Sequence, residues 1–237
     1  MNKQQPQKPD YRTDGALEVH SIFSTIQGEG PFVGQRATFI RLAGCNLQCP
    51  QCDTEYLVSK HPDIDTEYPG KYLQEVTHIL DEVVIYPNDL VVITGGEPFR
   101  QNLLPLVVAL LDANFIVQIE TNGTLYQDLP YQAITVVCSP KTGSINKDLL
   151  PHIAALKYVV SSDDVAKEDG LPNHALGHPA MPRLARPPEG FEGYVYIQPA
   201  DEKDEEKNQW NLEAAVHSTL KFGYILCLQV HKIAGVA

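Results

Sequence analysis

The sequence predicts an α/β fold in which parallel strands form an incomplete (β/α) barrel. Short runs rich in β-branched and aromatic residues alternate with stretches whose apolar residues recur at helical spacing. Most of the strand-like runs are continuously apolar, which is typical of strands covered on both faces. Seven or eight such runs with few full helices between them indicate a modified, TIM-like barrel rather than the complete eightfold one.

The predicted elements follow one another along the chain. A first strand is expected near residues 18–23, and clearer strands follow at 37–41, 90–94, 115–120, 133–138, 156–160, 194–198 and 224–229. Apolar residues at helical spacing predict helices over 72–84, 103–111 and 209–221. Residues 163–190, rich in Pro, Gly and His, predict a long loop or insertion. The acidic run at 201–206 is more typical of a solvated helix start than of an interaction patch.

Length and composition limit the classes of function. The 237 residues suit one large domain with a substantial core, which we expect at 16–237 after a disordered tail at 1–15 that is rich in Gln, Lys and Pro. The net charge of −12 disfavours general binding to nucleic acid or to an anionic membrane. We expect no membrane span and no signal peptide, because no suitable apolar run is present. The five cysteines fit a reducing compartment, so we expect a cytoplasmic protein.

Three cysteines, Cys45, Cys49 and Cys52, lie within eight residues directly after a predicted strand. Thiols this close together are typical of a metal site. A structural zinc site needs a closed set of four ligands, whereas three thiolates on a 4Fe-4S cluster leave one iron open. The spacing therefore favours a cluster with one reactive corner. Cys138 and Cys227 lie inside apolar strands and are most simply buried small hydrophobes.

Polar or glycine-bearing segments follow five predicted strands at the same end. Because the carboxyl ends of parallel strands meet at one edge of a sheet, we expect these segments to form one pocket rim. Taken singly, Asn122-Gly123 is also typical of a plain turn and Ser139-Pro140 of a strand terminator, so their shared position carries the inference. The segments are the cysteine loop and residues 95–98, 120–123, 138–141 and 198–201.

A series of short motifs occurs in a fixed order between residue 22 and the last residue. The motifs are Gln27-Gly28-Glu29-Gly30, Phe39-Ile40-Arg41-Leu42, the cysteine spacing ending in Cys52-Asp53-Thr54, Ile93-Thr94-Gly95-Gly96-Glu97-Pro98, Gln118-Ile119-Glu120-Thr121-Asn122-Gly123, Ser139-Pro140-Lys141, Gln198-Pro199 and Gln229-Val230-His231-Lys232. The cysteine spacing and the Gly-Gly-Glu-Pro motif resemble the radical S-adenosylmethionine (SAM) enzymes. The ordered set resembles, within them, the 7-carboxy-7-deazaguanine synthases.

The resemblance implies a barrel of the radical SAM type with a 4Fe-4S cluster on the three clustered cysteines and SAM on the open iron. It implies cleavage of SAM to a 5′-deoxyadenosyl radical and conversion of 6-carboxy-5,6,7,8-tetrahydropterin to 7-carboxy-7-deazaguanine with loss of ammonia, in 7-deazapurine (queuosine-type) biosynthesis. A homodimer and a flavodoxin- or ferredoxin-type reductant are implied as well. Thr54 would bind Mg²⁺, although that threonine alone would indicate only a helix cap.

The resemblance also assigns site residues. Arg41 offers a fork of donors that matches a carboxylate, and an ordinary salt bridge is its alternative. Glu120 would contact either the substrate or the SAM adenosine, and the sequence leaves this open. The expected cofactor contacts are Gly95, Gly96, Glu97, Ser139, Pro140, Lys141, Gln198, Pro199, Ala200 and Asp201. The expected substrate contacts are Ile26, Gln27, Gly28, Glu29, Arg41, Thr94, Glu120, His231 and Ala237.

Two functions from other classes stay open at this point. An activating enzyme that places a radical on a protein partner would need further cluster cysteines and would have no use for Arg41 or the Gln27-Gly28-Glu29 motif. A non-enzymatic zinc module would need a fourth ligand, such as a histidine or Cys138, and would be colourless. Residues 55–89 and 163–190 carry no motif that decides between these functions.

Overall fold

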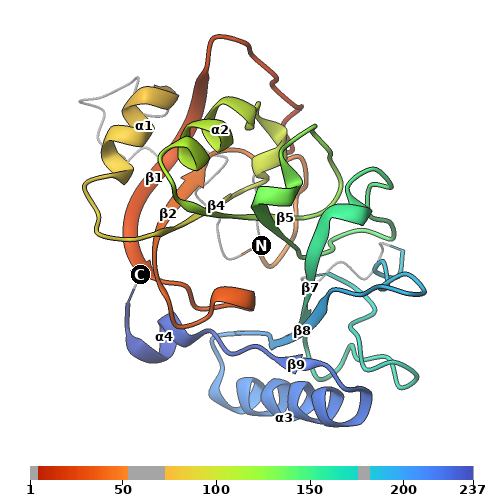
Figure 1. The fold of residues 1–237 in the computed structure, drawn as a ribbon. Helices are drawn as coiled ribbons and strands as arrows, with labels where there is room; N and C mark the ends of the chain where they lie inside the picture. Colours follow the sequence, from red (N-terminus) through yellow and green to blue (C-terminus); the bar gives the residue numbers. More distant parts are fainter. Residues whose placement is uncertain (1–4, 53–72, 176–181, 237) are drawn as a thin grey trace.

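Nine strands form one curved sheet in the part of the chain that this computed structural model describes, namely residues 5–52, 73–175 and 182–236 (Figure 1). From β2 to β9 each strand pairs in parallel with its neighbours, whereas β1 is antiparallel to β2 and β3. The strands, in sheet order, are β3 (Leu73–Glu75), β1 (Ala16–Ile26), β2 (Arg36–Leu42), β4 (Leu90–Gly95), β5 (Ile116–Thr121), β6 (Ile134–Cys138), β7 (Ile153–Val160), β8 (Tyr194–Pro199) and β9 (Ile225–Leu226). The sheet does not close, so the incomplete barrel is confirmed.

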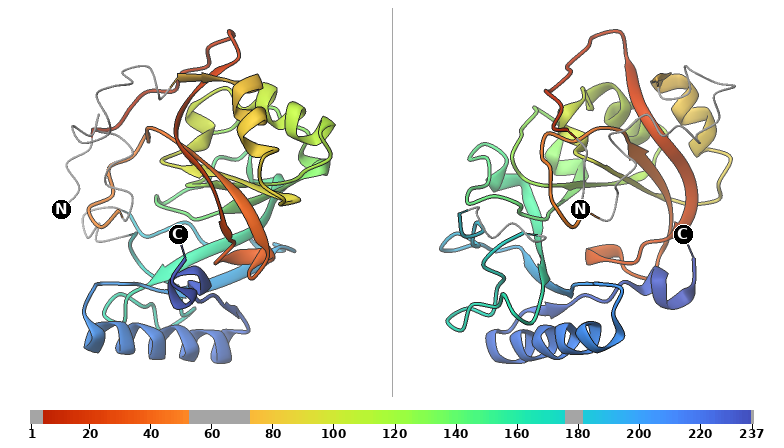
Figure 2. Two further views of the ribbon diagram at one scale, coloured as in Figure 1. Left: turned by 90° about the vertical axis from the view of Figure 1, so that its left-hand side faces the viewer. Right: turned by 180° about the vertical axis from the view of Figure 1, so that it is seen from behind.

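Four α-helices accompany these strands in the described residues. They are α1 (Val76–Val83), α2 (Leu104–Asp112), α3 (Glu205–Phe222) and α4 (Val230–Ala234). Figures 1 and 2 show α1 and α2 side by side, with α1 next to β1 and β3 and α2 next to β5, while α3 lies along β8 and β9. In the described residues, the connections from β5 to β6, from β6 to β7 and from β7 to β8 are loops and short 3-10 turns without an α-helix. None of the helices of the described chain is both long and apolar enough to cross a bilayer.

Most predicted elements are confirmed, and the differences have physical reasons. The helix expected from residue 72 begins at Val76, because residues 73–75 pair with β1 instead. β1 runs over eleven residues and is antiparallel, since it forms a hairpin with β2. β9 has only two residues, because the chain then turns toward the β1–β2 loop, where Val230 N donates to Gly28 O at 3.2 Å, and forms α4.

The acidic run after β8 is the start of α3, as predicted. Asp204 is the N-cap, and its side chain accepts hydrogen bonds from Glu206 N at 3.1 Å and Lys207 N at 3.2 Å. Carboxylates in this first turn face the positive end of the helix dipole. Gly223 ends the helix with a φ of 77°, a left-handed conformation that glycine adopts without steric cost.

The core that supports the site lies between the sheet and the pair α1 and α2. Side chains from both helices and from the middle of β4 are fully buried there, and each contributes about 1.5–3 kcal/mol to stability through burial. This packing makes the carboxyl end of β4 a rigid base. The central members are Ile79, Val83, Leu106, Leu110, Val91 and Ile93.

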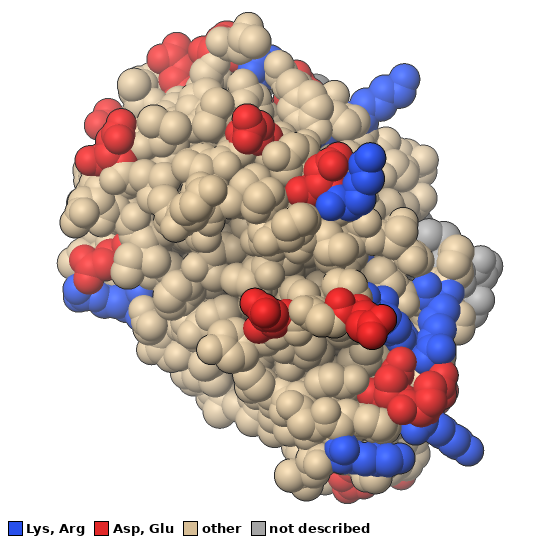
Figure 3. Space-filling view, turned by 45° about the vertical axis from the view of Figure 1, so that its right-hand side comes forward, with Lys and Arg blue, Asp and Glu red and all other residues tan. Residues whose placement is uncertain are grey.

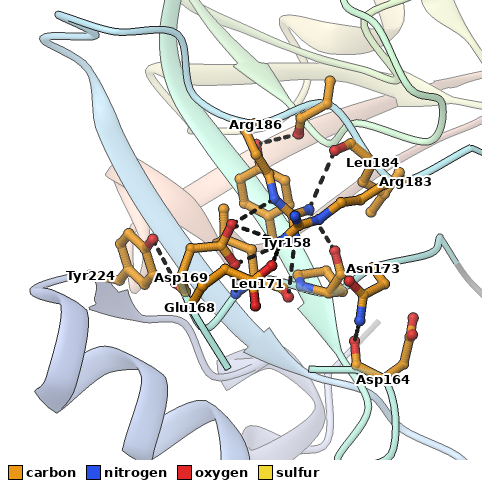
Figure 4. A network of polar contacts seen from close by, with 12 residues as sticks. Tyr158, Asp164, Glu168, Asp169, Leu171, Asn173, Arg183, Leu184, Arg186 and Tyr224 are labelled. Atoms are coloured by element: carbon orange, nitrogen blue, oxygen red, sulfur yellow. Dashed lines mark hydrogen bonds and ion pairs between the residues drawn. The ribbon is translucent and has the colours of Figure 1, made fainter. Parts of the chain in front are cut away.

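Residues 163–190, predicted as a long loop, are held by a polar network where the structure describes them (Figure 4). Arg186 donates to Asp169 at 2.8 Å and to the Pro172 carbonyl at 2.6 Å. The Asp169 carbonyl in turn accepts from the Tyr224 hydroxyl at 2.8 Å. Because the network joins the segment to β7 and to the end of α3, it replaces the crossover helix that a complete barrel would have at this place.

On the face seen in Figure 3, some acidic side chains lie beside basic ones and others stand apart, with wide uncharged areas between them. Within residues 163–190, Arg183 pairs with Glu168 at 2.7 Å and with Asp169 at 3.1 Å. The acidic side chains that stand apart agree with the net charge of −12.

The N-terminal segment differs from the expected tail. From residue 5 onward it is described, and it lies against the folded domain: Gln7 N donates to Cys45 O at 2.7 Å and Asp10 N donates to Arg100 O at 2.7 Å. Composition alone indicated a tail, but backbone groups of this segment match donors and acceptors of the domain. Such long-range pairing cannot be seen in local sequence.

Candidate active site

Most of the expected site residues lie at the carboxyl ends of β2, β4, β5, β6 and β8, as the predicted pocket rim requires (Figure 1). The β1–β2 loop lies at the opposite, amino end of β2, and its Gln27 reaches Glu120 near the end of β5. Next to this loop, α4 packs beside β1. Thr54 and Ala237 lie outside the described residues, so the magnesium ligand and the terminal carboxylate have no structural test.

The cysteine loop directly follows β2. Cys49 is buried, and Cys45 and Cys52 are partly exposed. The loop is ordered by short-range bonds: Leu47 N donates to Cys45 Sγ at 3.4 Å, and Cys52 N donates to Cys49 O at 3.2 Å. Burial, with smaller contributions from nearby Glu97 and the other two cysteines, raises the pKa of Cys45 to about 12. Cluster binding must therefore displace a proton from this thiol.

The loop fits a cluster better than a single ion. Among the described residues, no three His, Cys, Asp or Glu side chains are placed to hold one metal ion. In a 4Fe-4S cluster each thiolate binds a different iron, so the cysteines stand further apart than the ligands of one zinc. Cys138, the suggested fourth zinc ligand, is fully buried in β6 beneath Gly123. The zinc module is therefore disfavoured.

Gly95 and Gly96 form the turn after β4 on which the cysteine loop rests. A Cβ at Gly95 would lie 2.1 Å from the Leu42 carbonyl oxygen, and one at Gly96 would lie 2.1 Å from the Gly44 carbonyl oxygen. The same backbones are hydrogen bonded, since Glu97 N donates to Gly44 O at 2.9 Å. The sequence indicated close approach to a ligand, but here close approach to the protein's own cluster loop requires both glycines.

Glu97 is a fully buried carboxylate that joins the ends of β4 and β5. It accepts hydrogen bonds from Phe99 N at 3.0 Å, from the Thr121 hydroxyl at 2.7 Å and from Asn122 N at 2.7 Å. Burial raises its pKa to about 7, although these three donors act in the opposite direction. Its bonds are thus made to the protein, and it positions the loops on either side of it.

Asn46, which the sequence did not single out, connects the cysteine loop to the segment after β5, in addition to the connection through Glu97. Asn46 donates to the Thr124 hydroxyl at 2.8 Å and accepts from the Asn122 amide at 2.9 Å. The Thr124 hydroxyl also donates to Asn122 Oδ1 at 2.6 Å. A polar side chain directly after the first cysteine was the only local signal for this link.

The expected SAM residues on β6 and β8 lie further round the rim. Lys141 Nζ donates to the Ser139 carbonyl at 3.2 Å, so this motif folds back on itself after β6. Asp201 accepts from Lys232 Nζ at 2.8 Å and from Lys203 N at 3.0 Å. The hydrogen bond from Lys232 lowers the pKa of Asp201 to about 2. Asp201 therefore ties the end of β8 to α4.

Glu120 lies among the expected substrate residues. Gln27, which is 1% exposed, donates to Glu120 Oε1 at 3.1 Å, and the Thr94 hydroxyl donates to Glu120 Oε2 at 3.1 Å. Gln118 of the same strand adds a further donor at 3.1 Å. The carboxylate is thus oriented by three neutral donors from three separate segments of the chain.

Lys157 of β7 is a charged site residue that the sequence analysis missed. It forms an ion pair with Glu29, and each side chain is only 12% exposed. Gln229 donates to the same carboxylate at 2.8 Å, and the Gln198 amide, in the orientation that satisfies both groups, donates to it at 3.2 Å. Burial alone would raise the pKa of Glu29, but Lys157 and Gln229 lower it below its usual value. The sequence did contain a signal for this site residue, namely a lysine inside an otherwise apolar strand.

His231 and Arg41 complete this side of the site. His231 on α4 lies against the β1–β2 loop, where a Cβ at Gly28 would lie 1.8 Å from its Nδ1. Burial lowers the pKa of His231, with the charge of Glu29 opposing this. Arg41 is partly exposed, pairs in register with Thr94 of β4, and has its guanidinium 5.1 Å from the centre of the Phe23 ring.

A cavity of about 650 Å³ lies elsewhere, between α3 and residues 162–170. Its lining includes Trp210, His217 and Phe222, and none of the expected site residues. The candidate site is therefore assigned from its cysteines and buried polar groups and not from this cavity.

Comparison with known proteins agrees with this geometry. A family model described as a 4Fe-4S single cluster domain matches residues 26–139. The 7-carboxy-7-deazaguanine synthase of Rhodospirillum rubrum is 43% identical over 97% of this chain and 96% of its own, and that of Rickettsia prowazekii is 42% identical over 98% and 94%. The crystal structure of QueE from Escherichia coli superposes with a TM-score of 0.70 at 25% identity and covers 92% of this chain and 96% of its own. This chain therefore belongs to the 7-carboxy-7-deazaguanine synthase family.

Proposed function

We propose that this protein is a radical SAM lyase that converts 6-carboxy-5,6,7,8-tetrahydropterin to 7-carboxy-7-deazaguanine with loss of ammonia. The observation that carries the proposal is the nearness of two groups: the three cysteines after β2, and a buried polar network around Glu29 and Glu120. The two groups adjoin at β4, where Thr94 donates to Glu120 and Gly95 and Gly96 contact the cysteine loop. A 4Fe-4S cluster with SAM on its open iron supplies one-electron cleavage of a carbon–sulfur bond and a 5′-deoxyadenosyl radical.

The chain's own residues would hold this group in place. Cys45, Cys49 and Cys52 would bind the cluster, and the turn at Gly95 and Gly96 sets the position of their loop. The backbone of this turn, with the groups after β6 and β8, lies on the rim where SAM would extend. Glu97 is a positioning residue, because its carboxylate is engaged by the protein on both oxygens.

The charged network would bind the substrate. Arg41 offers parallel donors suited to the substrate carboxylate, and Glu120 offers acceptors suited to its guanidine-like edge. We place Glu120 on the substrate side because its partners Gln27 and Thr94 lie there. A neutral His231 presents one ring donor and one ring acceptor, which suits a polar heterocycle.

Glu29 and Lys157 would orient the network rather than take part in the radical step. Both remain charged, because each stabilises the ionised form of the other in a site with little water. Glu29 also accepts from Gln229, which immediately precedes α4. The pair thus connects the β1–β2 loop, β7 and the segment that carries His231.

Other parts of the sequence-based prediction enter as parts of this proposal. We infer magnesium at Thr54, a homodimer, a flavodoxin- or ferredoxin-type reductant and a cytoplasmic setting, the last supported by the number and clustering of the five cysteines. An activating enzyme with further cluster cysteines is less well supported, because Cys138 and Cys227 are both buried in the sheet region.

The test is anaerobic reconstitution followed by incubation with SAM, a reductant, magnesium and the tetrahydropterin, with mass spectrometry of the products. We expect a product lighter than the pterin by the elements of ammonia. Cys49→Ala should abolish it together with the brown colour, and Arg41→Ala should weaken it. Cys138→Ala, a buried cysteine outside the loop, should keep the cluster. Cleavage of SAM without any change to the pterin would refute the substrate assignment.

A further inference from the structure

Two buried side chains hold the backbone just before the first cluster cysteine. Arg100 and Gln101, each 3% exposed, both donate to the Ala43 carbonyl at 3.1 Å. The Gln101 side chain is itself hydrogen bonded to β1, since it accepts from Glu18 N at 2.6 Å and donates to Glu18 O at 3.0 Å. Arg100 forms an ion pair with the Glu18 side chain. The chain entering the cysteine loop is therefore attached to both β1 and the turn after β4.

Residues 7–12, here named the N-terminal strap, lie across the same place. Gln7 N donates to Cys45 O at 2.7 Å, which is a bond to the backbone of the first cluster ligand itself. Further along the strap, Arg100 Nη1 donates to Lys8 O at 3.3 Å, and Asp10 N donates to Arg100 O at 2.7 Å. Asp10 also forms a parallel bridge with Gln101. Arg100 is thus hydrogen bonded to the strap and to the cluster loop at once.

Gly44 shows how tightly these parts meet. It has a φ of +81°, and a Cβ there would lie 2.3 Å from the Gln7 side-chain oxygen and 2.6 Å from Arg100 Nε. The strap and Arg100 therefore occupy the space where a side chain of any other residue would stand. No part of the radical chemistry accounts for this arrangement, since none of the strap residues is an expected ligand or substrate contact.

We propose that the N-terminal strap, with Arg100 and Gln101 as positioning residues, holds Cys45 ready for the cluster and slows loss of the cluster. The inference rests on the cluster assignment within the proposed function. A ligand that is fixed before binding loses less conformational entropy when it binds. Groups that hold metal ligands in place typically change metal affinity by about 10–100-fold when they are removed.

The first variant is Gln7→Pro, because proline has no N–H to donate to Cys45 O. Asp10→Pro does the same for the bond to Arg100 O. The control is Gln5→Pro, which places the same residue at an exposed position of the same segment. After anaerobic reconstitution, loss of the visible cluster absorbance is followed in excess EDTA and, separately, in air. Thermal unfolding of each cluster-free protein shows whether the fold is kept.

We expect Gln7→Pro and Asp10→Pro to lose the cluster about ten-fold faster than wild type and Gln5→Pro, with unfolding temperatures close to wild type. Arg100→Met should lose it at least as fast, and Arg100→Lys, which keeps a charged donor, should recover part of the difference. Cluster loss at the wild-type rate in both proline variants would overturn the proposal. Because the rate is measured without pterin, faster loss with no pterin turnover would refute the proposed substrate and leave the strap supported.

Discussion

The two sides of the candidate site, named here the cluster side and the substrate side, consist of different kinds of chemical groups. The cluster side consists mainly of glycine turns, backbone hydrogen bonds and neutral amides, with Glu97 as a buried carboxylate and Arg100 as a buried cation paired with Glu18. The substrate side consists of charged groups, with the Glu29–Lys157 ion pair and Glu120 at its centre. A cluster brings its own charge and needs only space and fixed thiols, whereas recognition of a polar molecule requires fixed charges and donors. The difference therefore agrees with what the proposed function requires each side to bind.

The two sides also differ in how much stability a single substitution should cost. Loss of one neutral hydrogen bond on the cluster side should cost about 1 kcal/mol of stability. Removal of one partner of a buried ion pair typically costs about 3–5 kcal/mol, because a charge is left in a poorly solvated place. We therefore expect substitutions on the substrate side to lower stability most, and those on the cluster side to change cluster retention more than stability.

The largest expected effect is that of Lys157→Met. It should lower the free energy of unfolding of the cluster-free protein by about 3–5 kcal/mol, because the buried Glu29 loses its charged partner. Urea unfolding measures this. The control is Lys207→Met, whose 53%-exposed side chain pairs with Glu202 at 3.4 Å and should contribute less than about 1 kcal/mol. Adding Glu29→Gln to Lys157→Met should restore part of the loss. Equal effects of the two lysine substitutions would contradict this difference between buried and exposed pairs.

The buried carboxyl of the cluster side should make stability depend on pH. Glu97 has a folded pKa of about 7, above the ordinary 4.5, so its stabilising contribution is complete below pH 4.5 and is lost as the pH rises through 7. The loss should reach about 3 kcal/mol in the free energy of unfolding of the cluster-free protein. Urea titrations at pH 5, 6, 7 and 8 should show this slope. It should flatten in Glu97→Gln and persist in Glu213→Gln, an exposed site on α3; an unchanged slope in Glu97→Gln would refute the assignment.

Gly96→Ala tests whether close packing of the turn after β4 against the cysteine loop is needed for cluster binding, because it adds a methyl group without changing any charge. Its added methyl would lie 2.1 Å from the Gly44 carbonyl oxygen, so the cysteine loop must shift at a cost of about 1–3 kcal/mol. We expect iron content after reconstitution to fall well below that of wild type. In Gly34→Ala the methyl meets nothing within 4 Å, so iron content should be kept despite backbone strain at a φ of +87°. Full iron content in Gly96→Ala would show that the loop adapts.

The smallest expected effect concerns the link between β8 and α4. Lys232 holds the pKa of Asp201 at about 2, below its ordinary 3.8, so the contribution of this bond is present above pH 3.8 and is lost as the pH falls through 2. The side chains are 36% and 44% exposed, so solvent screening should limit it to less than about 1 kcal/mol. Asp201→Asn should therefore change unfolding in urea only slightly and mainly at low salt. A loss above 2 kcal/mol would mean that α4 depends on this pair.

The sequence identified much of the cluster side because its residues are neighbours in the chain. Cys45, Cys49 and Cys52 lie in one loop, and Gly95 and Gly96 form one turn, so spacing alone predicts them. Asn46 of the same loop was not predicted, because its hydrogen-bond partners are 76 and 78 residues away in the chain. Strand positions were also predictable, since buried parallel strands are continuous apolar runs. β9 is shorter than predicted because the chain turns toward the β1–β2 loop after Leu226, a long-range contact that the local sequence does not show.

The sequence by itself determined the fold class, the place of the site at the strand ends and the residues that would hold the cluster. These follow from local periodicity and from spacing within single loops. Only the tertiary structure decided that Lys157 neutralises Glu29, that Gln229 reaches Glu29 across 200 residues, and that the N-terminal strap bonds to Cys45. Such contacts depend on which strands become neighbours, and a buried charge selects its partner through the closed fold rather than through the local sequence.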